Sequence, residues 1–288
     1  MAASAVPRAY FVPRGENVFA ATPFTVGPWS GKLQHAGPPS ALVARAFEQK
    51  ARELGHPLVP RLSMFILKPI PAIDALFTVD VSIIRKGAAV SHLEASLKLL
   101  KKGGQGDEVI RAHAVCYRES TIDDLPRLAV QRAGIACPPS PEASAPVSFP
   151  TGWWNGASEH GYNKSMTLKI AGGDGISNGP CAIWSRVEVA VVEGEVATPL
   201  QRLIAFADSG NGVSACVPPA TVNFMNCDVT LHLNRMPRGD WMCLDARTDM
   251  STQGFGLATT RLFDAEGFIG TSNQSLFVSP FAKSPTKL

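Results

Sequence analysis

Asp208 is the residue of this chain best placed to do chemistry. It follows an apolar helical pattern and precedes the turn-forming run Ser209-Gly210-Asn211-Gly212. At the end of a helix the dipole disfavours a second negative charge, so a carboxylate there is inclined to take up a proton. Asp208 is therefore a candidate general base for activating a water molecule, and the alternative is a plain turn or C-cap carboxylate.

Polar side chains interrupt two later strand patterns. Gln274 lies within the apolar run 269–278, where it either faces solvent by alternation or faces inward and needs hydrogen-bond partners. Asn226, Asp228 and Thr230 alternate along one strand face, which is either hydrated or functional. A neutral amide at such a position can fix the orientation of a water molecule.

Two helices are predicted to position these residues. Ser40–Gln49 carries strong helix formers, with Pro38 and Pro39 near its start, where a missing N–H costs little. The second helix is Thr198–Ala207, in which Thr198 is a candidate N-cap and a proline occupies the first turn.

The remaining patterned segments are rich in β-formers and bounded by glycine and proline. They are 61–67, 76–84, 90–100, 109–117, 166–170, 183–192, 222–234, 241–248, 256–263 and 269–278. Each half thus has one helix followed by four long strands, and 80–97 overlays 245–262 without gaps. This order predicts an α+β fold in which an antiparallel sheet wraps around a central helix, twice, and it argues against Rossmann and TIM architectures.

A proline-rich segment divides the two halves. Residues 119–152 contain six prolines between Pro126 and Pro150, which break both helices and ladders. The predicted domains are therefore 1–118, a linker over 119–152, and 153–288, which carries the candidate site.

Composition excludes several classes of function. The 288 residues carry a net charge of +3 with no basic stripe, so no nucleic-acid partner is predicted. No apolar run is long enough for a membrane span. The histidines lack metal-ligand spacing, so neither a metal nor a cofactor is predicted. The predicted location is cytoplasmic, with a peroxisomal alternative because the tail Thr286-Lys287-Leu288 approaches the S-K-L import signal.

Three ordered motifs resemble the acyl-CoA thioesterase II-like family of double-hotdog proteins. They are Ala207-Asp208-Ser209-Gly210-Asn211-Gly212, the strand 224–233, and Gly270-Thr271-Ser272-Asn273-Gln274-Ser275-Leu276. In the first half, Trp29, the turn at Gly37 and the strand from Arg61 to Pro69 agree with that family's first hotdog. The resemblance covers nearly the whole chain outside the linker and termini, and it implies two fused hotdog domains.

The resemblance also implies a catalytic set. In that family a helix-end aspartate, a strand glutamine and a small polar residue hold one water. Carried over by motif, these are Asp208, Gln274 and Asn226, with Thr230 in the last role if the register slips. Better-known members have a hydroxyl where Asn226 stands. The expected reaction is acyl-CoA hydrolysis to free acid and coenzyme A, by a protein expected to form homo-oligomers of double-hotdog protomers.

Polarising the thioester carbonyl needs an N–H donor. A helix N-terminus is suited to this, and Gly37, before the first helix, is the candidate oxyanion residue. His35 is expected to be a surface or core histidine.

Two alternative functions remain open. The first is a hotdog hydratase or dehydratase acting on an enoyl or hydroxyacyl thioester. Such enzymes pair an Asp with a His, and the helix before Asp208 offers none. The second is a non-catalytic protein that binds acyl thioesters, which the departure at Asn226 keeps open.

Overall fold

The computed structural model describes residues 8–101, 106–123, 135–147, 160–218 and 221–280. The elements of the first half are β1 (Ala9–Gly15), β2 (Val18–Ala21), the 3-10 helix η1 (Pro23–Thr25), α1 (Gly37–Glu53), β3 (Leu58–Ile66), β4 (Leu76–Lys86), β5 (Val90–Leu99) and β6 (Asp107–Tyr117).

The second half repeats the order of one long helix before a run of long strands. Its elements are β7 (Ala145–Pro146), the 3-10 helix η2 (Tyr162–Lys164), β8 (Met166–Gly172), β9 (Cys181–Val187), β10 (Ala190–Val192), α3 (Pro199–Ala207), α4 (Gly210–Val213), β11 (Val222–Asn226), β12 (Asp228–Leu233), β13 (Trp241–Met250), β14 (Phe255–Asp264) and β15 (Gly267–Pro280).

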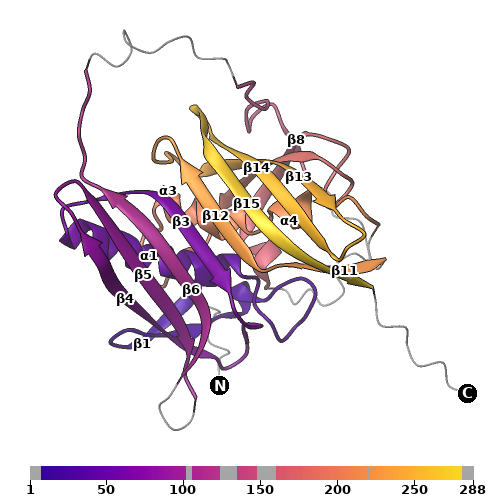
Figure 1. Ribbon diagram of the computed structural model, residues 1–288. Helices are drawn as coiled ribbons and strands as arrows, with labels where there is room; N and C mark the ends of the chain where they lie inside the picture. Colours follow the sequence, from indigo (N-terminus) through magenta and orange to yellow (C-terminus); the bar gives the residue numbers. More distant parts are fainter. Residues whose placement is uncertain (1–7, 102–105, 124–134, 148–159, 219–220, 281–288) are drawn as a thin grey trace, which may run out of the picture.

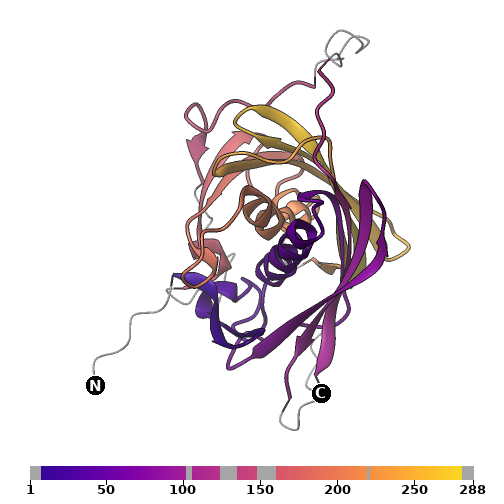
Figure 2. The ribbon, with the colours of Figure 1, turned by 90° about the vertical axis from the view of Figure 1, so that its left-hand side faces the viewer.

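The described strands form one continuous sheet. Its hydrogen-bonded order is β10-β1-β2-β4-β5-β6-β3-β12-β15-β14-β13-β9-β8-β7, and β11 pairs with β15. The two halves meet where β3 and β12 pair antiparallel, with Thr230 opposite Ser63. They meet again at the far edge, where β1 pairs in parallel with β10. The sheet therefore curls around the centre of the molecule, as Figure 1 and Figure 2 show.

The helices α1 and α3 lie side by side inside this curl (Figure 2). They run antiparallel, because Gly37 at the start of α1 lies against Ala205 near the end of α3, while Glu48 contacts Thr198 at the start of α3. The pair thus has two ends, which we name the Asp208 end and the Glu48 end after the carboxylate at each. Both helices are largely buried, and their apolar side chains join one hydrophobic core.

Local sequence signals account for both helices. Pro38 and Pro39 occupy the first turn of α1, as predicted. Thr198 caps α3, because its hydroxyl oxygen accepts a hydrogen bond from the Gln201 N–H at 3.2 Å. The predicted α+β fold, in which antiparallel strands wrap around a central helix in each half, is confirmed, and the strands of the two halves join in one sheet.

The structure differs from the predicted elements in three places. The segment 222–234 is not one strand, because the ladder is interrupted at Cys227 between β11 and β12. The segment 183–192 divides into β9 and β10, and β10 leaves its neighbour to pair with β1. The strands β1 and β2 were not predicted, because residues 9–21 show no clear alternation of apolar and polar residues.

The proposed domain boundaries stay a prediction. Within the expected linker, β7 pairs with β8, and the Pro139 carbonyl accepts a hydrogen bond from the Trp184 indole at 2.7 Å. These residues thus contact the second half. No helix in the described parts of the chain has the length and hydropathy that crossing a membrane requires.

Candidate active site

Asp208 is the C-cap residue of α3, and its side chain is almost completely buried. Its Oδ1 accepts a hydrogen bond from Asn226 Nδ2 at 2.7 Å. Its Oδ2 lies 2.8 Å from Nδ1 of His35, which belongs to the other half of the chain. Asp208 is thus the C-cap residue that the sequence allowed, and both of its carboxylate oxygens also contact polar side chains brought from distant elements.

Gln274 holds the turn that carries Asp208. It lies on β15 with 1% of its surface exposed, so it faces inward rather than toward solvent. Its Nε2 donates to the main-chain oxygen of Asp208 at 3.0 Å, and its Oε1 accepts from the N–H of Asn211 at 2.9 Å. Gly210 packs against this amide, since an added Cβ would lie 2.7 Å from Oε1 of Gln274. The amide thus fixes the backbone on both sides of Gly210.

Asn226 reaches the site because the ladder changes at the next residue. It is the last residue of β11 and lies opposite the buried Leu276 of β15. Beyond Cys227, the core-facing residues of β12 are Val229 and Leu231. The expected shared face of Asn226, Asp228 and Thr230 is therefore wrong.

Thr230 and Asp228 make other contacts. Thr230 donates to the Ser63 hydroxyl at 3.2 Å, across the junction of the two halves. The Asp228 carboxylate accepts from the Ser275 N–H at 2.6 Å. The structure thus brings Asp208, Gln274 and Asn226 together and places Thr230 elsewhere.

Gly37 lies at the Asp208 end of the helix pair. Its N–H is 3.1 Å from Nδ1 of His35. A Cβ at this position would lie 2.0 Å from the Ala205 carbonyl oxygen, so only glycine allows α1 and α3 to approach this closely. The predicted oxyanion residue is therefore next to the predicted base, joined to it through one imidazole nitrogen.

His35 is a residue of the site that the sequence interpretation missed. It is buried, as a core histidine would be, but it contacts Asp208 directly. The helix before Asp208 offers no histidine, as the sequence indicates, but the loop that precedes α1 in the first half delivers one. In the sequence, His35 is marked only by its position two residues before Gly37. That position places it near Asp208 only if α1 and α3 are neighbours.

Tyr162 fixes the plane of the His35 ring. The two rings stack with centroids 3.7 Å apart and planes 9° apart. The Tyr162 hydroxyl donates to the Ala205 carbonyl at 2.8 Å and also contacts the Ser209 hydroxyl. Burial, with smaller contributions from Tyr10 and Asp208, raises the pKa of the Tyr162 hydroxyl well above its ordinary value. The phenol therefore stays neutral beside the carboxylate.

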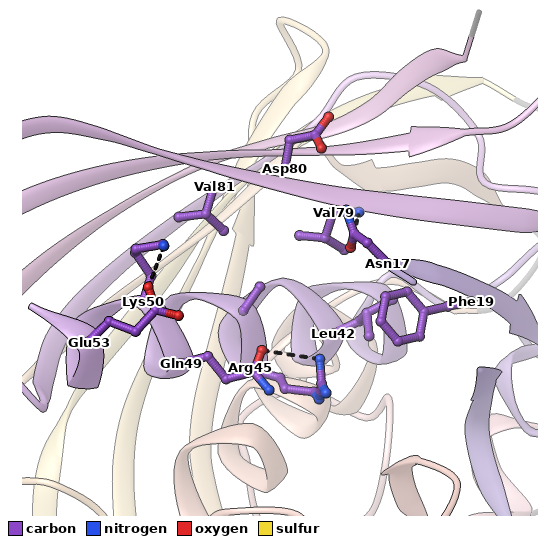
Figure 3. Close-up of a pocket in the computed structure, with 11 residues that line it drawn as sticks. Asn17, Phe19, Leu42, Arg45, Gln49, Lys50, Glu53, Val79, Asp80 and Val81 are labelled. Atoms are coloured by element: carbon purple, nitrogen blue, oxygen red, sulfur yellow. Dashed lines mark hydrogen bonds and ion pairs between the residues drawn. The ribbon is translucent and has the colours of Figure 1, made fainter. Parts of the chain in front are cut away.

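A hollow of about 320 Å³ lies elsewhere, between α1 and β4 (Figure 3). Its charged side chains are engaged with protein groups, since Arg45 pairs with Glu195 and Lys50 with Glu53. Arg45 is eight residues beyond Gly37, which is about 12 Å along a helix. We therefore treat the hollow as separate from the Asp208 end. In the described residues, no cluster of three or more His, Cys, Asp or Glu side chains is arranged to hold a metal ion.

The fold and two family models define a double-hotdog thioesterase. Residues 25–117 match the model of the acyl-CoA thioesterase N-terminal domain, and residues 141–278 match the model of the acyl-CoA thioesterase C-terminal domain. The chain belongs to the acyl-CoA thioesterase family and is a thioesterase. The resemblance noted in the sequence is thereby confirmed.

Solved structures share the whole fold. A protein of Novosphingobium aromaticivorans is 20% identical with a TM-score of 0.66, over 93% of this chain and 98% of its own. The acyl-CoA thioesterase II TesB2 of Mycobacterium marinum is 14% identical with a TM-score of 0.58, over 96% and 98%. A hot dog fold protein of Alicyclobacillus acidocaldarius is 15% identical with a TM-score of 0.61, over 96% of each chain. At these sequence identities, the similarity to the solved structures shows a shared fold alone. No curated protein sequence matches the chain.

Proposed function

We propose that this protein hydrolyses acyl-CoA thioesters with a water molecule that Asp208 activates and that Asn226 and Gln274 help to position. Asp208 removes a proton as the water oxygen bonds to the thioester carbonyl carbon. The carbon–sulfur bond then breaks, and the proton on Asp208 passes to the departing sulfur. The products are the free acid and coenzyme A.

The observation that carries this proposal is a buried aspartate that contacts one neutral amide through its side chain and a second through its main chain. Asn226 Nδ2 donates to Asp208 at 2.7 Å, which orients the carboxylate, while the Asn226 carbonyl oxygen can accept from a water. Gln274 Nε2 donates one N–H to the main-chain oxygen of Asp208, and its second N–H can bind the same water. We therefore expect an amide in the position of Asn226 to take the place of the hydroxyl that better-known members of the family have.

The proposed test is release of free thiol from a panel of acyl-CoA substrates, from short to long chain. The variant Asp208→Asn keeps the volume but removes the base, so we expect a loss of about 10²–10⁴-fold in kcat. The matched control is Glu48→Gln, which neutralises the buried carboxylate at the opposite end of the helix pair and is expected to keep most of the activity. Full activity in Asp208→Asn would refute the proposal.

Hydration of an enoyl thioester is a second candidate, because His35 lies 2.8 Å from Asp208. A histidine and a carboxylate in contact can divide acid and base roles in adding water across a double bond. Incubating the protein with an enoyl-CoA separates the two candidates. Thiol release supports hydrolysis, loss of the conjugated double bond without thiol release supports hydration, and binding without either change supports an accessory role.

We also propose that the protomers associate through the outer face of the sheet. Met225, Phe277 and Phe255 lie directly opposite one another across three neighbouring strands, and each is at least half exposed. Exposed apolar side chains grouped in this way are typical of an interface. Light scattering should give a mass above that of one chain, and Phe277→Ser should lower it.

The cellular compartment stays a prediction. The tail that motivates the peroxisomal alternative lies outside the described residues. An N-terminal fluorescent fusion with and without the last three residues would test it.

A further inference from the structure

We infer that His35 is a positioning residue whose Nδ1 proton holds the Asp208 carboxylate and leaves the Gly37 N–H free for the thioester carbonyl oxygen. The inference rests on the proposed hydrolysis and assigns to it a residue of the first half. It follows from two contacts that share one nitrogen atom.

The two contacts compete. His35 Nδ1 lies 2.8 Å from Asp208 Oδ2 and 3.1 Å from the Gly37 nitrogen. An imidazole nitrogen carries either a proton or a lone pair in the ring plane, so Nδ1 donates to one group or accepts from the other. With Asp208 ionised, as a general base must be, a lone pair on Nδ1 would face a negative oxygen. The base-competent state therefore requires Nδ1–H directed at Asp208.

This state changes what Gly37 can do. A protonated Nδ1 does not accept from the Gly37 N–H, so that donor is released at the N-terminus of α1, beside the carboxylate. Such an N–H can bind the oxyanion that forms when water attacks the thioester. The Nδ1 proton stays on His35 throughout, since the proton from water passes to Asp208 and then to sulfur. The imidazole thus links the base and the carbonyl-binding donor without entering the proton transfer.

The surroundings of His35 support a fixed ring. The stacked Tyr162 ring fixes its plane, and the Tyr162 hydroxyl is itself anchored to the Ala205 carbonyl of α3. The His35 main-chain N–H donates to the Thr25 carbonyl at 2.9 Å. A side chain fixed this way cannot easily turn Nδ1 away from Asp208. The tautomer of His35 therefore decides whether Nδ1 donates to Asp208 or accepts from Gly37.

The first test reads the tautomer by ¹⁵N NMR of histidine-labelled full-length protein. We expect a protonated Nδ1 at His35 in the wild type. In Asp208→Asn, the contact from Asn226 favours the carbonyl oxygen of the new amide on its own side, which turns the new NH₂ toward His35. We therefore expect Nδ1 to lose its proton and Nε2 to gain one. An unprotonated Nδ1 in the active wild type would overturn the inference.

The second test is kinetic. His35→Phe keeps an aromatic ring for Tyr162 but has no N–H, and we expect kcat to fall about 10²-fold with little change in KM, because the carboxylate loses its orientation. His35→Asn can present an N–H near the position of Nδ1 and should recover part of the loss. Wild-type activity in His35→Phe would overturn the inference. Absence of thiol release by the wild type would instead refute the proposed function, while the NMR signal would still report the tautomer.

Discussion

The Asp208 end and the Glu48 end of the helix pair are built alike but hold different chemistry. At each end a buried carboxylate on one helix lies near the first turn of the other. Glu48 accepts hydrogen bonds from the Thr198 hydroxyl at 2.9 Å and the Gln201 amide at 2.6 Å. Asp208 instead contacts Asn226 of a strand and His35. At the Glu48 end both named partners come from the start of α3, so this carboxylate anchors the capping Thr198 and the first turn of α3 to α1.

The sheet makes the difference between the two ends. The hairpin β4–β5 overlays β13–β14 without gaps, and in this overlay the next strands, β6 and β15, also correspond. Ala114 of β6 then occupies the position that Gln274 has on β15. Ala114 is buried and offers no polar group, whereas Gln274 holds the backbone around Asp208. The duplicated fold thus supplies two equivalent strand positions, of which the one on β15 carries a polar side chain and the one on β6 does not.

Among the comparisons of the two ends, the largest effect is expected from the buried glutamines Gln274 and Gln201. Gln274→Met removes the hydrogen bonds to Asp208 and Asn211, so we expect kcat to fall about 10²-fold. Unfolding in urea should also show a loss of about 1–3 kcal/mol, because buried backbone groups lose their partners. Gln201→Met at the Glu48 end should cost stability yet leave kcat nearly unchanged. Equal losses of kcat in both variants would erase the distinction between the ends.

A smaller effect is expected from the glycine at the helix contact. In Gly37→Ala the new methyl group would overlap the Ala205 carbonyl, so the helices must separate at the Asp208 end. We expect a loss of about 1–3 kcal/mol in the free energy of unfolding, as for overpacked cores, together with reduced activity. Gly212→Ala is the control, since nothing lies within 4 Å of its added Cβ. Unchanged stability in Gly37→Ala would contradict the tight contact.

The smallest effect concerns pH. Burial raises the pKa of Glu48 above its ordinary value of 4.5, although hydrogen bonds from Gln201 and Thr198 and the charge of Arg52 oppose the shift. The folded state therefore holds this proton more tightly than the unfolded state. The resulting stability is present below pH 4.5 and is lost as the pH rises through the folded-state pKa. Urea unfolding at several pH values should show that the free energy of unfolding of Glu48→Gln rises relative to that of the wild type as the pH rises.

Much of the fold could be predicted because its signals are local. The Thr198 cap, the proline-rich start of α1 and the placement of Asp208 at the end of α3 all follow from neighbouring residues. The Asp208–Asn226 contact followed only from the family motif.

The missed features depend on long-range geometry. The contact between His35 and Asp208 exists because two helices from different halves lie antiparallel, and Tyr162 joins them from beyond the proline-rich segment. The interruption at Cys227 follows from pairing with β15 rather than from any turn residue. The local sequence pattern does not predict these contacts, because each arises from packing between distant segments.

The most direct test of the central claim, that Asp208 activates water rather than attacking the thioester itself, is a single-turnover reaction in H₂¹⁸O. With enzyme in excess over acyl-CoA, the free acid should carry one ¹⁸O atom and the peptide containing Asp208 none. Incorporation of ¹⁸O into the Asp208 carboxylate would contradict the account, because it would mean that the carboxylate had bonded to the acyl group and was then freed by water.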